Sequence, residues 1–121
     1  MVVEQVDFVT VPTRDPGRAL AFYRDVLGLE PSAYTEGEVE TPNVTLSFWD
    51  PTRDGEPFEP NRAGIGLRVG DVPEAVEEVR AAGGTVIGIE DSGVCTMGFV
   101  EDPDGNVLIL HRRYAPRVRR G

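Results

Sequence analysis

The sequence contains no lysine, one cysteine and one histidine. Cys95 can form no internal disulfide, and the absence of any CxxC or HxxxH spacing excludes the zinc-knuckle and redox-pair classes. No apolar run approaches the roughly 20 residues that a membrane span needs. Residues 1–9 lack the basic start of a signal peptide. We therefore expect a cytoplasmic protein with no membrane partner, whose fold depends on packing alone.

Positive charge is scarce as well. The 12 basic residues are all arginine and stand against 21 acidic residues, which gives a formal net charge of -9. Such a chain repels phosphate backbones, so nucleic acid is not an expected partner. The C-terminus differs from the rest, and there we expect a solvated or subunit-docking tail rather than an anion-binding arm. Its five arginines are Arg112, Arg113, Arg117, Arg119 and Arg120.

The 121 residues, 40% of them hydrophobic, are enough for a single domain over residues 1–121 with its own core. Residues 2–11 are rich in β-branched side chains and predict a first strand. A helix follows, because Asp15 is a typical N-cap, Pro16 suits the first helical position and Gly28 suits the end. Residues 43–50 alternate between apolar and polar, which predicts another strand.

The same pattern then returns. Asp71 is a second N-cap candidate, and it lies 56 residues after Asp15 (71 − 15), with Pro73 in the first turn that follows. The proline-rich connector 51–62 separates the two copies, so the modules run over about 1–60 and about 61–121. The second module ends in strand 93–101, the turn 102–106 (DPDGN) and strand 107–113.

Each half is expected to form a βαβββ module. The helix covers one face of the sheet in each module and leaves the other face uncovered. Two modules together predict an α+β fold in which a curled, half-open mixed sheet carries the helices on the outside. The concave surface of this sheet is where a ligand would bind.

The helix DPGRALAFYRDVLGL, the DPDGN turn and the two half-repeats resemble the vicinal oxygen chelate superfamily. This superfamily includes glyoxalase I, extradiol dioxygenases and bleomycin resistance proteins. The resemblance covers essentially the whole chain, but the matching motifs are helix caps, packing residues and a turn. It therefore implies the fold and a homodimer, while one fold of this kind hosts many activities.

The resemblance also implies where metal ligands stand in the metal-dependent members. Those positions fall on Asp7, on Gly64, on Ile109 and near Ser47, and of these only Asp7 has a side chain suited to binding a metal ion. A divalent ion needs about three or four converging ligands. We therefore expect no metal or other cofactor, and a binder of the bleomycin resistance type that performs no chemistry.

Two alternatives remain open at this point. The chain could be a lyase, isomerase or dioxygenase that uses an atypical metal set with His111 and acidic residues, or a metal-free acid–base pair of Asp7 and His111. It could also be a structural partner whose cavity is vestigial, and then a closed, side-chain-filled pocket is expected.

The ligand positions implied by the resemblance, together with the alternation of side chains along a strand, predict the lining of the concave face. The ligand-binding set is expected to be Asp7, Ser47, Trp49, Arg68 and His111, within a wider lining that adds Val9, Thr45, Gly64, Gly66 and Ile109. Ile65, Leu67, Val44, Leu46, Phe48, Leu108 and Leu110 are expected to pack on the helix side. Glycines that open space, an indole and polar groups suit a small aromatic ligand with a polar or anionic group.

Several of these side chains have a second interpretation. His111 fits a structural role at a strand end or dimer contact as well as a ligand contact. Trp49 fits the core as well as a stacking platform, and Cys95 fits a small buried hydrophobe better than a nucleophile. The charge of Arg68 lies between Leu67 and Val69, so it must reach solvent, a carboxylate or a ligand.

Overall fold

A computed structural model describes residues 1–116, and the chain divides into two compact units. The first unit comprises residues 1–61 and 103–106, and the second comprises residues 62–102 and, within the described chain, 107–116. The α+β class and the two βαβββ modules are confirmed, and the strands are divided between two separate four-stranded mixed sheets. The single domain over residues 1–121 stays a prediction. Arg117, Arg119 and Arg120 of the predicted tail lie outside the described residues.

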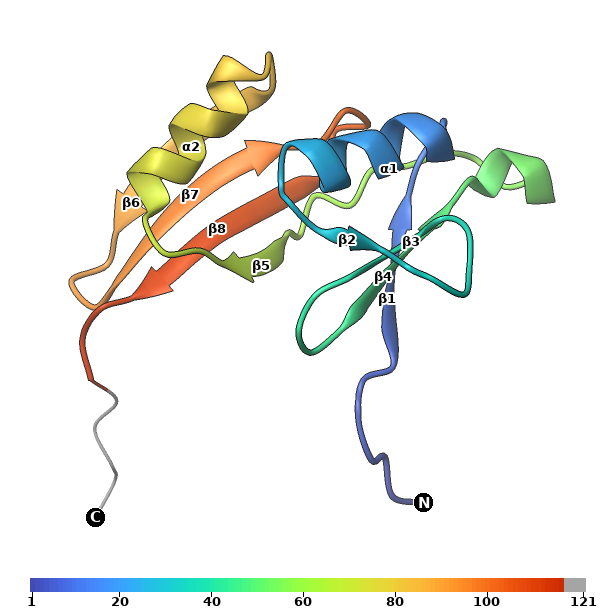
Figure 1. The fold of residues 1–121 in the computed structure, drawn as a ribbon, viewed down its shortest axis with the longest axis horizontal. Coiled ribbons are helices and arrows are strands. Elements are labelled where there is room, and N and C mark those ends of the chain that lie inside the picture. The colour runs from blue at the N-terminus through green and yellow to red at the C-terminus, as the bar shows by residue number, and fades with distance from the viewer. Residues whose placement is uncertain (117–121) are drawn as a thin grey trace. The chain divides into compact units, whose positions relative to one another are not determined.

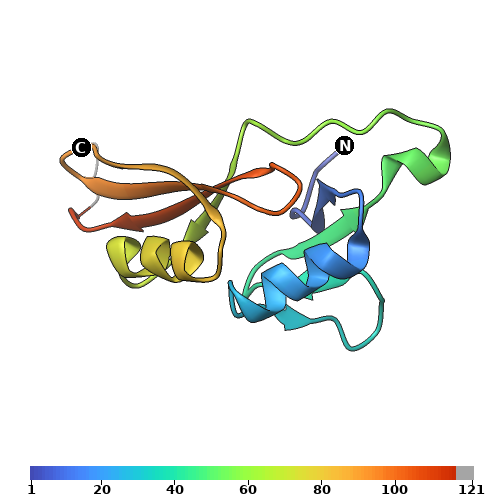
Figure 2. The ribbon, with the colours of Figure 1, turned by 90° about the horizontal axis from the view of Figure 1, so that it is seen from above.

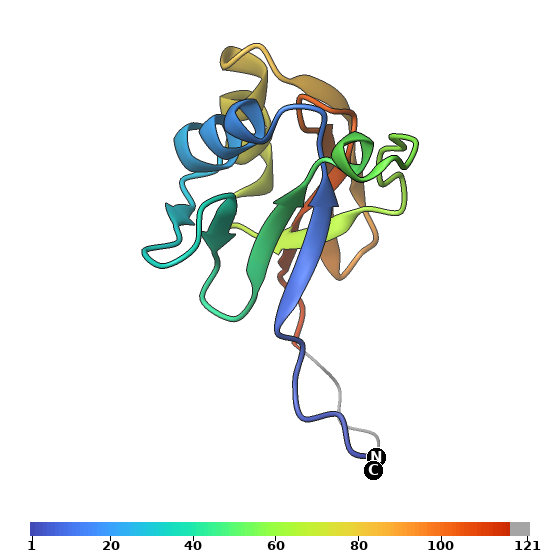
Figure 3. The same cartoon turned by 90° about the vertical axis from the view of Figure 1, so that its right-hand side faces the viewer.

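The sheet of the first unit has the strand order β1-β4-β3-β2. β1 and β4 run parallel and side by side, whereas β4 pairs with β3 and β3 with β2 in the antiparallel sense (Figure 3). The elements of this unit are β1 (Phe8–Pro12), α1 (Pro16–Asp25), β2 (Glu30–Pro31), β3 (Glu38–Glu40), β4 (Thr45–Trp49) and the short 3-10 helix η1 (Pro51–Asp54).

The ends of α1 follow the local signals in the sequence. The Asp15 carboxylate accepts a hydrogen bond from the Arg18 backbone N–H (3.1 Å), and Pro16 occupies the first turn. Gly28 has a φ of 71°, a left-handed conformation that glycine adopts without strain. The helix then buries Tyr23 against the sheet, with ring centroids 4.9 Å from Phe48 in an edge-on arrangement.

The first strand is shorter than predicted. Residues 2–11 are rich in β-branched side chains, but β1 begins only at Phe8, opposite Thr45 at the start of β4. Residues before Phe8 have no strand partner in the sheet, and Val2 and Val3 are largely exposed. Strand propensity without a hydrogen-bonding partner does not make a strand, because backbone pairing and packing supply its stability.

The predicted connector 51–62 contains one ordered turn. Asp50 accepts hydrogen bonds from the backbone N–H and the hydroxyl of Thr52 (3.0 and 2.6 Å), which starts η1 directly after β4. Gly55, with a φ of 77°, ends it. A helix of four residues is too short to produce a hydrophobic period in the sequence, so the connector shows no periodicity.

The second unit repeats the arrangement with longer strands. Its sheet has the order β5-β8-β7-β6, with β5 and β8 parallel and the other two pairs antiparallel. Its elements are β5 (Ile65–Arg68), α2 (Val72–Ala81), β6 (Thr85–Asp91), β7 (Cys95–Glu101) and β8 (Val107–Arg113). No helix in residues 1–116 is long and apolar enough to cross a membrane.

α2 covers one face of the sheet that contains β6, β7 and β8 (Figures 1 and 2). Asp71 caps the helix by accepting from the Glu74 backbone N–H (2.9 Å). Val76 and Val79 are buried on the sheet side, and a methyl group added at Gly98 of β7 would lie 2.5 Å from the Val76 Cγ2 atom. The glycine therefore lets the helix approach the sheet closely.

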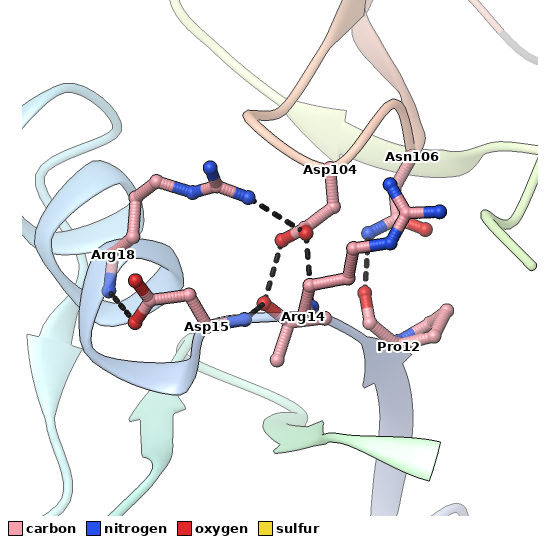
Figure 4. Close-up of polar contacts among 7 residues, drawn as sticks. Pro12, Arg14, Asp15, Arg18, Asp104 and Asn106 are labelled. Atoms are coloured by element: carbon pink, nitrogen blue, oxygen red, sulfur yellow. Dashed lines mark hydrogen bonds and ion pairs between the residues drawn. The ribbon is translucent and has the colours of Figure 1, made fainter. Parts of the chain in front are cut away.

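The turn that connects β7 and β8 belongs to the first unit, although both strands belong to the second. The buried carboxylate of Asp104 accepts hydrogen bonds from the Thr13 hydroxyl (2.6 Å) and the Arg14 backbone N–H (2.9 Å) (Figure 4). The Arg18 guanidinium forms an ion pair with the same carboxylate at 2.9 Å. The Asn106 amide donates to the Pro12 carbonyl (2.8 Å). The DPDGN motif thus forms the predicted turn. Its side chains also form hydrogen bonds with the end of β1 and with the loop between β1 and α1.

At the far end of β8, Tyr114 contacts the turn between β6 and β7. Its hydroxyl donates a hydrogen bond to Asp91 Oδ1 (2.6 Å). This bond, together with one from the Gly93 N–H, holds the pKa of the Asp91 carboxyl below its ordinary value. The same carboxylate raises the pKa of Tyr114, because it favours the protonated phenol.

Replacing Tyr114 by phenylalanine is expected to move the pKa of Asp91 back up toward its ordinary value. A carboxyl with a depressed folded-state pKa adds stability above its unfolded-state pKa, and this stability is lost as the pH falls through the folded-state pKa. The variant should therefore lose less stability on acidification than the parent protein. An NMR titration of the side-chain carboxyl of Asp91 measures the shift, and Tyr34→Phe, at a fully exposed tyrosine, is the control. An Asp91 titration that Tyr114→Phe leaves unchanged would contradict this assignment.

Candidate functional site

In the first unit the candidate site is the face of the sheet turned away from α1. Leu46 and Phe48 of β4 are buried on the helix side, as predicted, so Thr45, Ser47 and Trp49 point to the other face. On β3, Glu38 is opposite Ser47 and Glu40 is opposite Thr45. The Glu40 carboxylate accepts a hydrogen bond from the Thr45 hydroxyl (2.6 Å). This face is therefore polar along β3 and β4.

The predicted face of β1 is wrong by one residue. Val9 and Val11 are opposite Leu46 and Phe48, which places Val9 on the helix side rather than on the candidate face. Phe8 is opposite Thr45 instead, and its side chain is 58% exposed. Because side chains alternate, a one-residue shift moves every side chain of the strand to the opposite face.

The repeat in the sequence contains the signal for this correction. The offset of 56 residues that relates Asp15 to Asp71 also relates Phe8 to Gly64 (64 − 8). Asp7 precedes β1, is exposed, and accepts a hydrogen bond from the Gln5 side chain (2.7 Å). The residue that shares the candidate face with Ser47 is thus Phe8, which takes the position that the sequence-based prediction gave to Asp7.

Trp49 is held at the end of β4 with its indole accessible. The indole N–H donates a hydrogen bond to Asp54 Oδ2 of η1 (2.7 Å), and the residue is 41% exposed. Of the two interpretations of Trp49, this arrangement fits a stacking platform better than a core position. The sequence places Asp54 in an irregular connector and gives no indication of this contact.

In the second unit the predicted faces agree with the burial. Leu108 and Leu110 of β8 are buried on the helix side, so Ile109 and His111 lie on the opposite face. His111 is opposite Arg68 of the parallel strand β5 and opposite Met97 of β7. Neither Arg68 nor His111 makes a side-chain hydrogen bond or ion pair with any of residues 1–116. Two groups that can carry positive charge are therefore neighbours on this face.

Gly66 lies in β5 and Gly64 lies just before this strand, and the space around the two glycines differs. Nothing lies within 4 Å of a methyl group added at Gly66, so this glycine opens space as predicted. At Gly64 such a group would lie 2.9 Å from the Ile109 Cδ1 atom. The prediction that Gly64 opens space is therefore wrong, because the side chain of Ile109 already fills it.

The donor set for a metal ion is poor. The resemblance implies four ligand positions, and with the observed register of β1 they fall on Phe8, Ser47, Gly64 and Ile109, none of which is a good metal ligand. In neither unit of the described chain do three His, Cys, Asp or Glu side chains come together to hold a metal ion. These residues do not fit the metal centre of the metal-dependent relatives.

Cys95 is the first residue of β7 and is half-buried opposite Arg113. It lies on the sheet beside the end of β8, where its thiol is less enclosed than the buried position predicted for it. Arg112 and Arg113, the part of the arginine-rich tail that is described, are exposed.

The first unit also contains a pocket that the sequence does not indicate. Its volume is about 650 Å³, and it lies where the first turn of α1, the loop between β2 and β3, the end of β4 and η1 come together. The lining is an apolar wall with acidic groups around it. It includes Leu20, Phe48, Trp49, Glu36, Glu38, Asp50, Arg53 and Asp54.

These observations agree with the comparison to known proteins. The family model of the glyoxalase/bleomycin resistance protein/dioxygenase superfamily matches residues 5–110. The chain therefore belongs to this superfamily, and the resemblance predicted from its caps and turn is confirmed. No sequence among curated proteins matches the chain.

Solved structures similar to this chain include binders and enzymes. TnmS3, an antibiotic binding protein from Streptomyces sp. CB03234, is 27% identical over 94% of this chain and 99% of its own, with a TM-score of 0.79. A superfamily member from Sphaerobacter thermophilus is 25% identical over 90% and 97%, with a TM-score of 0.73. A lactoylglutathione lyase from Agrobacterium tumefaciens shares the fold at 20% identity over 91% and 94%, with a TM-score of 0.72.

Proposed function

We propose that this chain is a homodimeric binding protein for a small aromatic molecule and that it works without a resident metal ion. One observation carries the proposal. The βαβββ architecture is intact, while the positions at which the resemblance implies metal ligands carry Phe8, Ser47, Gly64 and Ile109. A Lewis-acid mechanism needs an ion with several protein ligands, and these side chains do not supply them.

The chemistry of the two faces supports binding. In the first unit, Phe8 and Trp49 are exposed aromatic side chains on strands that pair directly. In the second unit, Arg68 and His111 are available to a carboxylate or another anionic group. A relative of 27% identity, TnmS3, binds an antibiotic, which is consistent with a small-molecule ligand for this chain.

The proposed homodimer rests on the sheet edges. In the described chain each sheet ends in two edge strands, β1 and β2 in one and β5 and β6 in the other. Unpaired edges expose backbone hydrogen-bonding groups, and association with a second copy is a common way to cover them. Light scattering on the purified protein is expected to give twice the mass of the 13.2 kDa chain. A mass of one chain at micromolar concentration would contradict this part of the proposal.

The absence of a resident metal is tested on protein purified without a histidine tag. Mass spectrometry should find far less than one equivalent of metal. Added Mn²⁺, Fe²⁺, Co²⁺, Ni²⁺ or Zn²⁺ should leave the melting temperature unchanged, because an ion that binds only the folded state would raise it. About one equivalent of metal, with a stabilisation that His111→Ala abolishes, would favour the alternative of a metal-dependent enzyme.

Ligand binding is tested with a library of aromatic carboxylates, by thermal shift and then by calorimetry. We expect Arg68→Ala to weaken the binding of a hit by roughly tenfold or more, because a hydrogen bond to a charged group contributes about 1.5–3 kcal/mol. Arg80→Ala removes the same charge from the exposed side of α2 and is the matched control. Equal affinities of the two variants would contradict a role for Arg68, and turnover of a hit would contradict a pure binder.

A further inference from the structure

We propose that the pocket of the first unit is a binding site for an organic cation with an apolar or aromatic body. The pocket shares Trp49 and Glu38 with the open face of the first-unit sheet, but the rest of its lining is different. It contains none of the four positions that correspond to metal ligands in other members, and neither Arg68 nor His111 lies in it. The inference rests on the pocket's size, its apolar wall and the sign of the charge around it.

The size and wall suit a small molecule. A volume of about 650 Å³ lies within the range of roughly 300–1,000 Å³ that is usual for ligand pockets. Leu20 of α1 and Phe48 and Trp49 of β4 provide the apolar surface. Because all three stand on regular elements, the wall is formed before a ligand arrives.

The charge around the pocket is strongly negative. Four carboxylates, those of Glu36, Glu38, Asp50 and Asp54, line it together with a single guanidinium, that of Arg53. Arg53 is 3.5 Å from Asp50 and is thus already placed beside a carboxylate. An anionic ligand would be repelled, whereas a cation would be attracted.

Two of the four carboxylates already have structural tasks. Asp50 accepts from the Thr52 hydroxyl and backbone N–H, and these bonds hold the pKa of Asp50 below its ordinary value. Asp54 accepts the hydrogen bond from the Trp49 indole (2.7 Å). Both groups therefore keep η1 and the indole in place.

The other two are free to act on a ligand. Within residues 1–116, neither the Glu36 nor the Glu38 side chain makes a hydrogen bond or an ion pair. Glu36 lies in the β2–β3 loop and Glu38 is the first residue of β3, so the two border the pocket on either side of Gly37. A pair of unengaged carboxylates beside an accessible indole is the chemistry that recognises ammonium groups, by charge and by cation–π attraction.

Trp49 is the only tryptophan, so its indole N–H gives a single, well-separated NMR signal at the wall of the pocket. We would titrate ¹⁵N-labelled protein with benzyltrimethylammonium, with benzyl alcohol as the neutral probe and phenylacetate as the anionic one. The cation is expected to shift the indole signal saturably, and the other two probes to shift it much less.

The charge dependence is tested with the double variant Glu36→Gln and Glu38→Gln. It is expected to weaken binding of the cation by about tenfold, since each exposed charge pair contributes up to about 1 kcal/mol, which is roughly fivefold. The matched control is Glu74→Gln with Glu78→Gln. It removes the same two charges from the exposed side of α2 and should leave the affinity unchanged.

The outcomes separate this site from the proposed function. Equal binding of the cation and the neutral probe, or equal losses in the two double variants, would overturn the cation site. A saturable cation response that Arg68→Ala leaves intact would support it, whether or not aromatic carboxylates bind elsewhere on the chain.

Discussion

Replacing Asp104 by alanine is expected to lower the free energy of unfolding by about 3 kcal/mol. The carboxylate is buried and accepts hydrogen bonds from the Thr13 hydroxyl (2.6 Å), the Arg14 backbone N–H (2.9 Å) and the Arg18 guanidinium (2.9 Å). Alanine leaves the first two donors without their acceptor in a place that water reaches poorly. Urea denaturation followed by the fluorescence of Trp49, which lies in the same unit, measures the loss.

Two further variants identify the source of this effect. Arg18→Ala removes only the ion pair, and because Arg18 is half-exposed we expect a cost below about 1 kcal/mol. Asp104→Asn keeps an acceptor of the same shape and should fall between the two. If Asp104→Ala cost no more than Arg18→Ala, the bonds to Thr13 and Arg14 would not be what holds the turn.

Replacing Gly98 by alanine is expected to destabilise the second unit by about 2–3 kcal/mol through overpacking. The new methyl group would lie 2.5 Å from Val76 Cγ2 and 3.1 Å from Val72 Cγ1, so α2 would have to move away from β7. Both valines are buried and belong to the apolar face of the helix, which limits how far they can shift. Denaturation followed by far-ultraviolet circular dichroism measures the change.

A second substitution makes this prediction specific. Val76→Ala removes the methyl group in the closest contact, so the double variant should be destabilised by at least about 1 kcal/mol less than the two single costs together. Gly66→Ala, where nothing lies within 4 Å of the added methyl group, is the control and should be nearly neutral. Additive costs for Gly98→Ala and Val76→Ala would show that the clash lies elsewhere.

The sequence predicted the helices well because their ends depend on local chemistry. Asp15 and Asp71 cap the backbone three residues further on, and Pro16 and Gly28 act through their own dihedral angles. The same holds for the DPDGN hairpin, whose strands pair from Glu101 and Val107 outward as expected. None of these features requires a partner from a distant part of the chain.

The candidate site was less predictable, and β1 shows why. Asp7 and Phe8 are neighbours in the sequence, and only the pairing of Phe8 with Thr45 decides which of them lies on the open face. The repeat offset points to Phe8, but strand propensity alone does not, since residues 2–11 look equally suited to a strand. The pocket beside Trp49 left no local pattern either, because its lining comes from α1, the β2–β3 loop, β4 and η1, which meet only in the folded chain.

By itself the sequence determined the two-module repeat, the helix caps, the turns and the faces of β5 and β8 in the second module. The tertiary structure decided the face of β1, the space beside Gly64 that Ile109 fills and the acidic pocket. It also decided the partners of Asp104, since Thr13 lies 91 residues before it. The physical reason is the separation along the chain of the residues that interact. Caps and turns form from residues a few positions apart, whereas register, packing and pockets depend on segments that meet only when the chain is folded.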